Sequence, residues 1–193
     1  MTLEIKISKK LIPYKLAFKF LKKRVDSLKK QKGKDLLWIL EHPLTFTCGI
    51  RSKKNEILDK TIKVIETNRG GKITLHNPGQ KIVYFVLNLN NKKKNIRNLV
   101  KQIEISIIEF LKLYNIKSNA DKKNIGIWVG DKKIAAIGIK VSRWIAYHGC
   151  SVNINNNLED YKKIIPCGLD NNKITSIQME SKKKVANINK NLK

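Results

Sequence analysis

The sequence has few cysteines, and they are not arranged for cross-linking or metal binding. Cys48, Cys150 and Cys167 are odd in number, far apart and without a CxxC pair. This count and spacing disfavour a disulfide framework and a zinc ribbon, and they favour a reducing, cytoplasmic setting. The three histidines lack metal-ligand spacing as well, so no metal site is expected.

Long apolar stretches are also absent. No run approaches the roughly 18 residues that a transmembrane helix needs, so we expect no membrane span. The amino terminus has no apolar core followed by a small-residue cleavage site, which disfavours a signal peptide. A GxxxxGK[ST] pattern does not occur either, and this disfavours an NTPase of the P-loop kind.

Acidic residues are scarce. Fifteen Asp and Glu stand against 41 Lys and Arg, a net charge of +26 that would suit a partner with an acidic surface. Lysine supplies 36 of the basic residues, however, and Lys, Asn and Ile together make up 84 of the 193 residues. A genome-wide compositional bias would produce the same excess, so the charge permits an acidic partner without establishing one. No RNP motif, zinc finger or helix-turn-helix pattern supports nucleic-acid binding.

The chain does contain enough apolar residues to build a core. Hydrophobic residues make up 41% of the sequence, and there is no internal repeat, Gly/Ser linker or sharp change of composition. We therefore expect one domain over residues 1–193. Residues 181–193 are poor in apolar residues and rich in lysine, which predicts a frayed basic tail.

The apolar pattern predicts an α/β (α+β) fold. Strands are predicted over 3–7, 36–40, 62–66, 82–87 and 143–155, and a β-hairpin over 125–129 and 133–139. Helices are predicted from Pro13 to about residue 30, over 95–115, and briefly over 158–165, where Pro166 closes the helix. Residues 41–52 are expected to form a loop.

Four short segments could carry chemistry. In the first, residues 69–80 (RGGKITLHNPGQ), Arg69 brings a fixed positive charge, and Gly70 and Gly71 allow the backbone to approach a ligand closely. If the middle of this segment is extended, Thr74 and His76 point to one side. The combination is typical of a ligand-binding loop, although an ordinary hairpin loop would contain the same residue types.

The other three segments are less specific taken singly. Cys167 lies between Pro166 and Gly168, where a restricted backbone could expose a nucleophilic sulfur, but a free cysteine is more often a small buried hydrophobe. Lys133 begins the second arm of the hairpin, and local sequence alone makes it a solvated surface lysine. His148 precedes a glycine in a predicted strand, where histidine is usually a hydrogen-bonded structural group.

In their order along the chain, these segments resemble the lipoyl(octanoyl) transferases, also called the lipoate-protein ligase B family, over roughly residues 36–177. EHPLTFTCG resembles the family's EHP…T-x-G stretch, and RGGKITLHNPGQ resembles its RGG-x-x-T-x-H-G-P-G-Q signature. Residues 126–155 resemble the segment that contains K-I-x-x-[IL]-G and H-G-x-x-[LV]-N, and IPCGL resembles the P-C-G motif. Each piece is moderately specific, and four in the right order are strongly specific.

The resemblance implies a fold and a reaction. The fold is a mixed β-sheet flanked by helices, similar to the catalytic domain of biotin and lipoate protein ligases. The reaction moves an octanoyl group from the thioester of acyl carrier protein to an enzyme cysteine, and then to a lysine of a lipoyl domain, as the first step of protein lipoylation. The implied acceptors are the lipoyl domains of 2-oxoacid dehydrogenase complexes and the glycine cleavage carrier protein, and no cofactor is implied.

Carried over residue by residue, the acyl-bearing cysteine is Cys167. The active-site lysine, which stands just before I-x-x-[IL]-G, is Lys133, whereas Lys140 corresponds to the basic residue that follows the glycine-aliphatic pair. The implied substrate-binding residues are Arg69, Gly70, Gly71, Lys72, Ile73, Thr74, Leu75, His76, Ala136, Ile137, Gly138, Gly149, Cys150 and Ser151. Two positions depart from the family pattern: Asn77 replaces the usual glycine of H-G-P-G-Q, and Cys150 stands where an aromatic or aliphatic residue is common.

Physical chemistry agrees with these roles. An ammonium next to a thiol stabilises the thiolate and lowers the pKa of the thiol, and the lysine, once neutral, can accept a proton from the attacking amine. Backbone N–H groups near Cys167 and Gly168 could hold the oxyanion. Exchange of one thioester for another is nearly neutral and amide formation drives the sequence, so ATP is not needed. Each buried methylene of the acyl chain would contribute about 0.8 kcal/mol.

The main alternative is an ATP-dependent lipoate or biotin protein ligase, whose catalytic domain is thought to share this fold. Such an enzyme activates a free acid as an adenylate and needs no cysteine nucleophile. A P-C-G cysteine, Cys167, that follows Lys133 by 34 residues argues against it.

Overall fold

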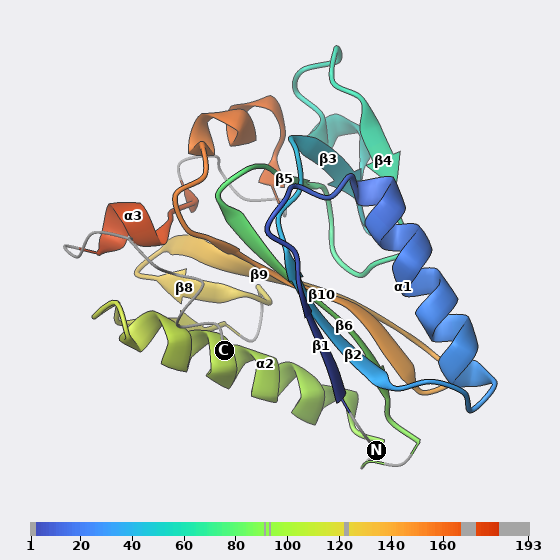
Figure 1. Cartoon of the computed structure of the whole chain (residues 1–193). Coiled ribbons are helices and arrows are strands. Elements are labelled where there is room, and N and C mark those ends of the chain that lie inside the picture. The colour runs from blue at the N-terminus through green and yellow to red at the C-terminus, as the bar shows by residue number, and fades with distance from the viewer. Residues whose placement is uncertain (1–2, 91, 93, 122–123, 167–172, 182–193) are drawn as a thin grey trace.

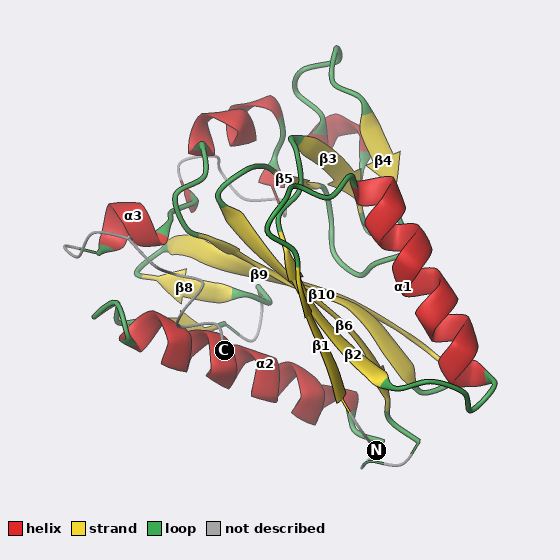
Figure 2. Ribbon diagram, viewed as in Figure 1, coloured by secondary structure: helices red, strands yellow, loops and turns green. Residues whose placement is uncertain are grey.

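A mixed seven-stranded sheet forms the centre of the computed structural model, which describes residues 3–90, 92, 94–121, 124–166 and 173–181 (Figures 1 and 2). In spatial order its strands are β1 (Leu3–Ile7), β2 (Asp35–Leu40), β6 (Gln80–Asn88), β10 (Ile145–Asn153), β9 (Lys132–Ser142), β8 (Ile127–Val129) and β7 (Asn119–Ala120). Strands β1 and β2 run parallel, and the other neighbours run antiparallel. The predicted α/β class with a mixed sheet is confirmed.

A smaller sheet has the strand order β4-β3-β5. Its strands are β4 (Val64–Glu66), β3 (Thr45–Cys48) and β5 (Thr74–His76). Strand β3 corrects the sequence analysis, which treated residues 41–52 as a loop. Both partners of β3 lie far along the chain, and Phe46 packs in a core cluster with Ile73 and Leu75. The strand therefore depends on tertiary contacts, which its short sequence does not reveal.

Helix α1 (Tyr14–Lys29) covers one face of the large sheet (Figure 1). Pro13 stands at the N-cap, one residue before the helix. The residues that α1 buries recur every three or four positions and are Tyr14, Ala17, Leu21, Val25 and Leu28. They pack against apolar residues of β2, β6 and β10. This packing places the ring of Tyr14 beside the site described below.

Helix α2 (Ile96–Lys112) covers part of the opposite face. Alternation along β6 directs Tyr84 and Val86 towards α1, whereas Phe85 and Leu87 belong to the cluster that includes residues of α2. The Asn95 side chain caps the helix by accepting a hydrogen bond from the backbone N–H of Asn98 (2.9 Å). In the described part of the chain, none of the helices is long and apolar enough to cross a membrane.

The predicted β-hairpin is formed by β8 and β9, and β9 is longer than predicted because it also pairs with β10 along most of its length. The predicted short helix over 158–165 is the 3₁₀ helix η2 (Leu158–Lys163). A second 3₁₀ turn, η1 (Lys54–Glu56), and a short helix, α3 (Ile177–Glu180), complete the described elements. The predicted basic tail, apart from Ser181, lies outside the described residues.

Candidate active site

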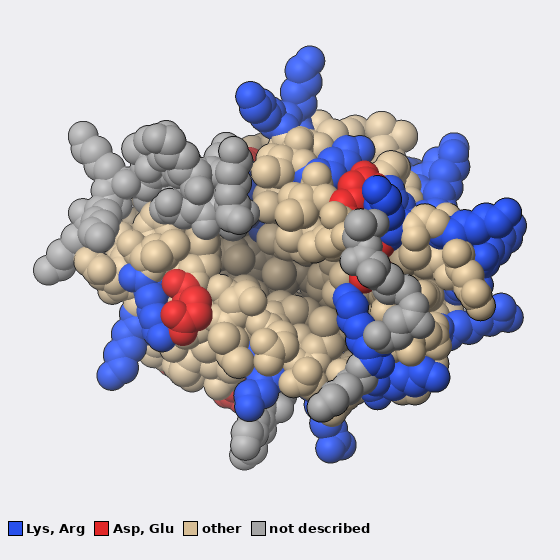
Figure 3. Space-filling model, turned by 60° about the horizontal axis from the view of Figure 1, so that its bottom comes forward, with Lys and Arg blue, Asp and Glu red and all other residues tan. Residues whose placement is uncertain are grey.

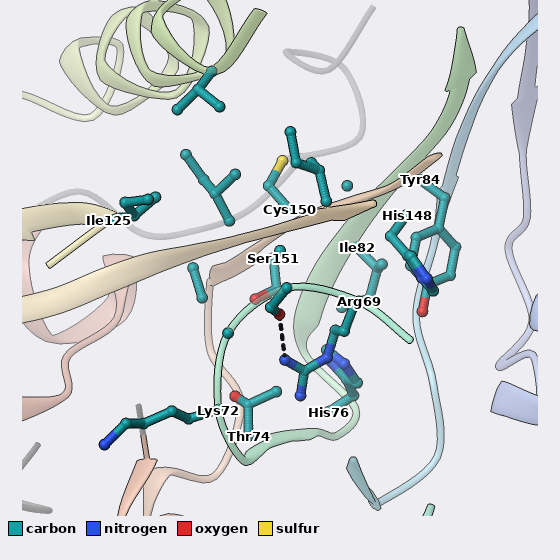
Figure 4. A pocket seen from close by; sticks show the side chains of 18 of the residues that line it. Arg69, Lys72, Thr74, His76, Ile82, Tyr84, Ile125, His148, Cys150 and Ser151 are labelled. Atoms are coloured by element: carbon teal, nitrogen blue, oxygen red, sulfur yellow. Dashed lines mark hydrogen bonds between the residues drawn. The ribbon is translucent and has the colours of Figure 1, made fainter. Parts of the chain in front are cut away.

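A cavity of about 600 Å³ lies between α2, the loop that carries Arg69, and strands β9 and β10 (Figure 4). Most residues that the sequence analysis grouped line this cavity: Arg69, Gly70, Gly71, Lys72, Thr74, His76, Lys133, Ala136, Ile137, Gly138, Gly149, Cys150 and Ser151. Ile73 and Leu75 do not line it, because they alternate with Thr74 and His76 and pack into the core behind β5. Cys167 lies outside the described residues.

Three glycines form one wall of the cavity. Gly138 on β9 and Gly149 on β10 are paired residues, and the backbone N–H of Gly70 donates to the carbonyl of Ile139 (3.1 Å). A Cβ atom on Gly149 would lie 1.9 Å from the carbonyl oxygen of Val83, and one on Gly138 would lie 3.2 Å from that of Gly70. Since none of the three residues has a side chain, this wall is backbone that a ligand can approach closely.

The guanidinium of Arg69 holds the glycine loop in place. It is buried, with 8% of the residue exposed. Nη2 donates to the carbonyl (2.8 Å) and the hydroxyl (2.9 Å) of Thr47 on β3, and Nη1 donates to the carbonyl of Gly70 (3.0 Å). Figure 4 shows this side chain beside the cavity, near Ser151 and His76. Arg69 therefore brings positive charge to the wall and also ties the loop to the small sheet.

His76 lines the cavity as a neutral imidazole. The side-chain nitrogen of Gln80 donates to Asn153 Oδ1 (2.9 Å), so its oxygen faces His76 and accepts from Nδ1 (2.7 Å). This arrangement fixes the proton on Nδ1. Burial and the nearby His42 lower the pKa of His76 to about 3, so the ring carries no charge at neutral pH.

His148 is neutral for a similar reason. Asn68 donates through its amide nitrogen to the hydroxyl of Tyr147 (2.8 Å), so its oxygen accepts from Nε2 of His148 (2.7 Å). Burial, followed by the charges of Arg69 and Lys140, lowers the pKa of His148 to about 3. The backbone of His148 has a φ of 73°, which breaks the alternation of β10 and lets the ring stack on Phe18 of α1.

Sequence reasoning missed two tyrosines at this end of the cavity, Tyr14 and Tyr84. Behind them, His42 donates from Nδ1 to the carbonyl of Ile12 and accepts at Nε2 from the hydroxyl of Tyr84 (2.9 Å). Burial lowers the pKa of His42 to about 4 and raises that of both tyrosines. No spacing in the sequence links these residues, since α1, the segment after β2, and β6 bring them together only by packing. Within the described residues, no group of His, Cys, Asp and Glu could hold a metal ion.

Lys133 is a buried lysine, with 5% of the residue exposed. Its Nζ donates to the carbonyl of Ile125 (3.1 Å) and lies 4.9 Å from the centre of the Trp128 ring. Among the described residues no carboxylate forms an ion pair with it. Gly126 leaves the room that this side chain occupies, because a Cβ there would lie 2.9 Å from the Cε of Lys133. Among the described residues, the Nζ of Lys133 thus contacts a carbonyl dipole and an aromatic face, both of which attract a cation.

The described residues on both sides of Cys167 lie near Lys133. Pro166, directly before the cysteine, lines a small cavity of about 10 Å³ together with Lys133 and Ile174. On the other side, Ile174 forms a β-bridge with Lys133, and the N–H of Thr175 donates to the carbonyl of Lys133 (3.0 Å). Pro166 and Ile174, which flank residues 167–172 in the sequence, thus lie next to the lysine that the resemblance selects.

The two departures from the family pattern have different surroundings. Asn77 is buried, and its amide nitrogen donates to the carbonyl of Asn157 (2.8 Å) and to a carboxylate oxygen of Asp160 (3.0 Å), so here the side chain takes part in the packing. Cys150 lines the cavity on the α2 side, and burial raises the pKa of its thiol to about 12. Cys150 therefore contributes apolar surface rather than a nucleophile.

A family model described as the lipoyl protein ligase A/B catalytic domain matches residues 13–192. The chain belongs to this family. Curated relatives include the octanoyltransferase of Wolbachia sp. subsp. Brugia malayi (strain TRS), 39% identical over 89% of this chain and 86% of that protein. The octanoyltransferase of Ehrlichia chaffeensis (strain ATCC CRL-10679 / Arkansas) is 41% identical over 91% of this chain and 85% of that protein.

Solved structures show the same fold at low sequence identity. The bipartite lipoate protein ligase from Thermoplasma acidophilum has a TM-score of 0.75 and 12% identity over 100% of this chain and 81% of that chain. The biotin protein ligase from Aquifex aeolicus, solved with biotin and ATP, has a TM-score of 0.53 and 15% identity over 98% of this chain and 65% of that chain. The expected likeness to the fold of lipoate and biotin ligases is confirmed.

Proposed function

We propose that this chain transfers an octanoyl group from the thioester of an acyl carrier protein, through Cys167, to a lysine of a lipoyl domain. The chain is an acyltransferase, as relatives named octanoyltransferase at 39 and 41% identity indicate. The observation that carries the residue assignment is the position of Lys133. It is a buried lysine without a carboxylate partner in the described structure, in the wall of the cavity and beside both described flanks of Cys167.

In the first step, the thiolate of Cys167 attacks the carbonyl carbon of the donor thioester. A new C–S bond forms, the C–S bond to the carrier breaks, and the carrier thiolate leaves and takes the proton of the Lys133 ammonium, which leaves Lys133 neutral for the second step. The ammonium of Lys133 would stabilise the attacking thiolate, which is the reactive form of cysteine. A lysine held by a carbonyl and a ring has its charge available for this task, because no carboxylate in the described residues neutralises it.

In the second step, the neutral amine of the acceptor lysine attacks the enzyme thioester. A C–N bond forms, the C–S bond to Cys167 breaks, and the amine proton passes to neutral Lys133, which acts as general base. Amide formation makes the sequence favourable overall, so the proposal needs no nucleotide. The bare glycine wall and the neutral histidines suit an uncharged acyl chain.

The proposal also includes the acceptors, which are the lipoyl domains of 2-oxoacid dehydrogenase complexes and the glycine cleavage carrier protein, and a cytoplasmic location. The ATP-dependent ligase remains the alternative, but its support is a likeness of fold at 12 to 15% identity, which shows the fold alone.

Intact-protein mass spectrometry tests the proposal. We expect incubation with octanoyl-acyl carrier protein, in ATP-free buffer with a metal chelator, to add one octanoyl group that hydroxylamine removes. Peptide mapping should place it on Cys167, and Cys167→Ser should abolish it, whereas Cys48→Ser and Cys150→Ser should retain it. An acyl group on Cys48 or Cys150, or an absolute need for ATP and magnesium, contradicts the assignment.

A further inference from the structure

The cavity carries more positive charge than an uncharged acyl chain requires. Its lining includes four cationic side chains, Arg51, Arg69, Lys72 and Lys133, and no Asp or Glu among the described residues. Three of them have partners or roles within the protein: Arg69 is bonded to Thr47 and Gly70, Lys133 lies beside the reaction centre, and Lys72 is paired with Glu56. This leaves the role of Arg51 to be explained.

Lys72 is neutralised within the protein. Its Nζ lies 2.8 Å from a carboxylate oxygen of Glu56, whose side chain is only 5% exposed. By contrast, Arg51 is exposed, and no carboxylate in the described part of the chain forms an ion pair with it. Since Arg51 both lines the cavity and reaches solvent, it stands at the cavity mouth with its charge available to a ligand. Figure 3 shows a hollow on the α2 side of the molecule, with a mostly uncharged rim and with Lys and Arg side chains farther out around it.

The backbone of Arg51 is held firmly although its side chain is exposed. Residues 49–52 form a turn that is bonded to the glycine loop by three backbone hydrogen bonds. In these bonds Gly49, Ile50 and Arg51 donate to the carbonyls of Lys72 (3.3 Å), Arg69 (3.0 Å) and Gly71 (3.0 Å), respectively. A Cβ on Gly49 would lie 2.4 Å from the carbonyl oxygen of Gly71, so the turn sits directly on the loop. The Arg51 side chain therefore starts from a fixed point beside the glycine wall.

The presence of arginine rather than lysine at position 51 indicates the kind of ligand it suits. The chain has 36 lysines and only five arginines, so a compositional drift towards basic residues accounts for lysine rather than arginine. A guanidinium differs from an ammonium by its planar pair of N–H donors, which match two oxygens of one phosphate. An exposed arginine on a fixed turn at a cavity mouth is thus suited to a phosphate group.

We infer that Arg51 binds the phosphate of the prosthetic arm that carries the acyl thioester. This inference rests on the proposed function, in which the donor is an acyl carrier protein, whose thioester is attached through a phosphopantetheine arm. The neutral acyl end enters the cavity, whereas the phosphate, which is costly to bury, remains at the mouth. Arg51 then acts as a specificity-determining residue that recognises the arm rather than the acyl chain.

Equilibrium binding provides a test that does not depend on turnover. The probes are two unreactive thioethers, S-octyl-phosphopantetheine and S-octyl-pantetheine, which differ only in the phosphate. We expect wild type to bind the phosphorylated probe at least about tenfold more tightly, as for a charge-assisted pair. In Arg51→Gln the ratio of the two affinities should fall to near one, and in Arg51→Lys it should be intermediate. Arg143→Gln, an exposed arginine outside the cavity lining, should keep the wild-type ratio.

Kinetics separates the inference from the function it rests on. With octanoyl-phosphopantetheine and octanoyl-acyl carrier protein as donors, Arg51→Gln should raise KM about tenfold with little change in kcat, and octanoyl-pantetheine should be unaffected. Three results would overturn the role of Arg51. They are a raised KM of Arg51→Gln for all three donors, a raised KM for the carrier protein alone, and an unchanged ratio of probe affinities. Absence of transfer by wild type from every donor would reject the proposed function instead, while the binding ratio would still decide on Arg51.

Discussion

The titratable side chains at the two ends of the cavity are all buried, but burial has a different consequence at each end. At the lysine end, Lys133 is held by the carbonyl of Ile125 and the ring of Trp128. At the histidine end, His76 and His148 are hydrogen-bonded to the side chains of Gln80 and Asn68 and lie near the Arg69 guanidinium, and burial first of all lowers the pKa of each to about 3. Figure 4 shows Ile125 on one side of the cavity and Tyr84 with His148 on the other.

The difference follows from what each group can do when it is desolvated. An imidazole loses its proton easily, so burial removes its charge. The Nζ of Lys133 instead contacts a carbonyl oxygen and an aromatic face, both of which attract a cation. A site that activates a thiol needs charge beside the sulfur, whereas neutral imidazoles add no charge to the surface that an alkyl chain contacts. We therefore expect substitution of Lys133 to change the reaction rate and protonation of the histidines to change the stability of the fold.

The largest effect should come from acid. The unfolded chain binds protons on its histidines below about pH 6.5, whereas folded His42 does so near pH 4 and folded His76 and His148 near pH 3. The unfolded state thus holds more protons between these values, so stability falls as pH decreases from 6.5 towards 4. Each histidine adds about 1.4 kcal/mol per pH unit to this slope.

Urea unfolding at a series of pH values measures the slope. His42→Gln removes one titrating group and should reduce the slope between pH 6 and 4.5 by one proton, whatever the change in absolute stability. A free energy of unfolding that stays constant over this range would show that the histidines are not kept neutral by the fold.

The next largest effect should follow loss of charge at the lysine end. Lys133→Ala should slow octanoyl transfer by about a hundredfold or more, the usual range for loss of a general base. It should also slow alkylation of Cys167 at pH 7, because without the ammonium the pKa of the thiol rises. Lys133→Arg keeps the positive charge, but arginine cannot release its proton to act as a base. This variant should therefore retain part of the alkylation rate and lose most of the rate of amide formation.

Lys140 provides the matched control. It lies on the same strand and is half-buried, but it does not line the cavity. Lys140→Ala should change both rates only slightly. Near wild-type turnover and unchanged alkylation in Lys133→Ala would show that the resemblance selected the wrong lysine.

The smallest effect should come from Cys150, which lines the cavity but has a thiol pKa of about 12. Iodoacetamide at pH 8 should therefore modify Cys167 and leave Cys150 largely unreacted in the folded protein. Cys150→Val should alter stability by less than about 1.5 kcal/mol and transfer by no more than about twofold, because the change is nearly volume-conserving. Rapid alkylation of Cys150, read by peptide mass spectrometry, would mean that this wall is open to water and that the thiol ionises.

Sequence alone was enough to predict the helices and most of the large sheet. Helical spacing located α1 and α2 to within a few residues, and the hairpin of β8 and β9 followed from two apolar runs around Gly130-Asp131. Strand β3 was missed because its four residues gain their structure from β4 and β5, which lie far along the chain. Local periodicity records which face of an element is buried, but not which distant element covers it.

The candidate site divides in the same way. Motif order singled out Cys167, Lys133 and the glycine segments, since these depend on residue type and position along the chain. Tertiary structure decided that Ile73 and Leu75 point into the core and that Tyr14 and Tyr84 line the cavity. It also decided that three histidines far apart in sequence are neutral and that Arg51 stands at the mouth without a carboxylate partner in the described residues. Burial and charge neutralisation depend on what packs against a group, and only the folded chain defines that surrounding.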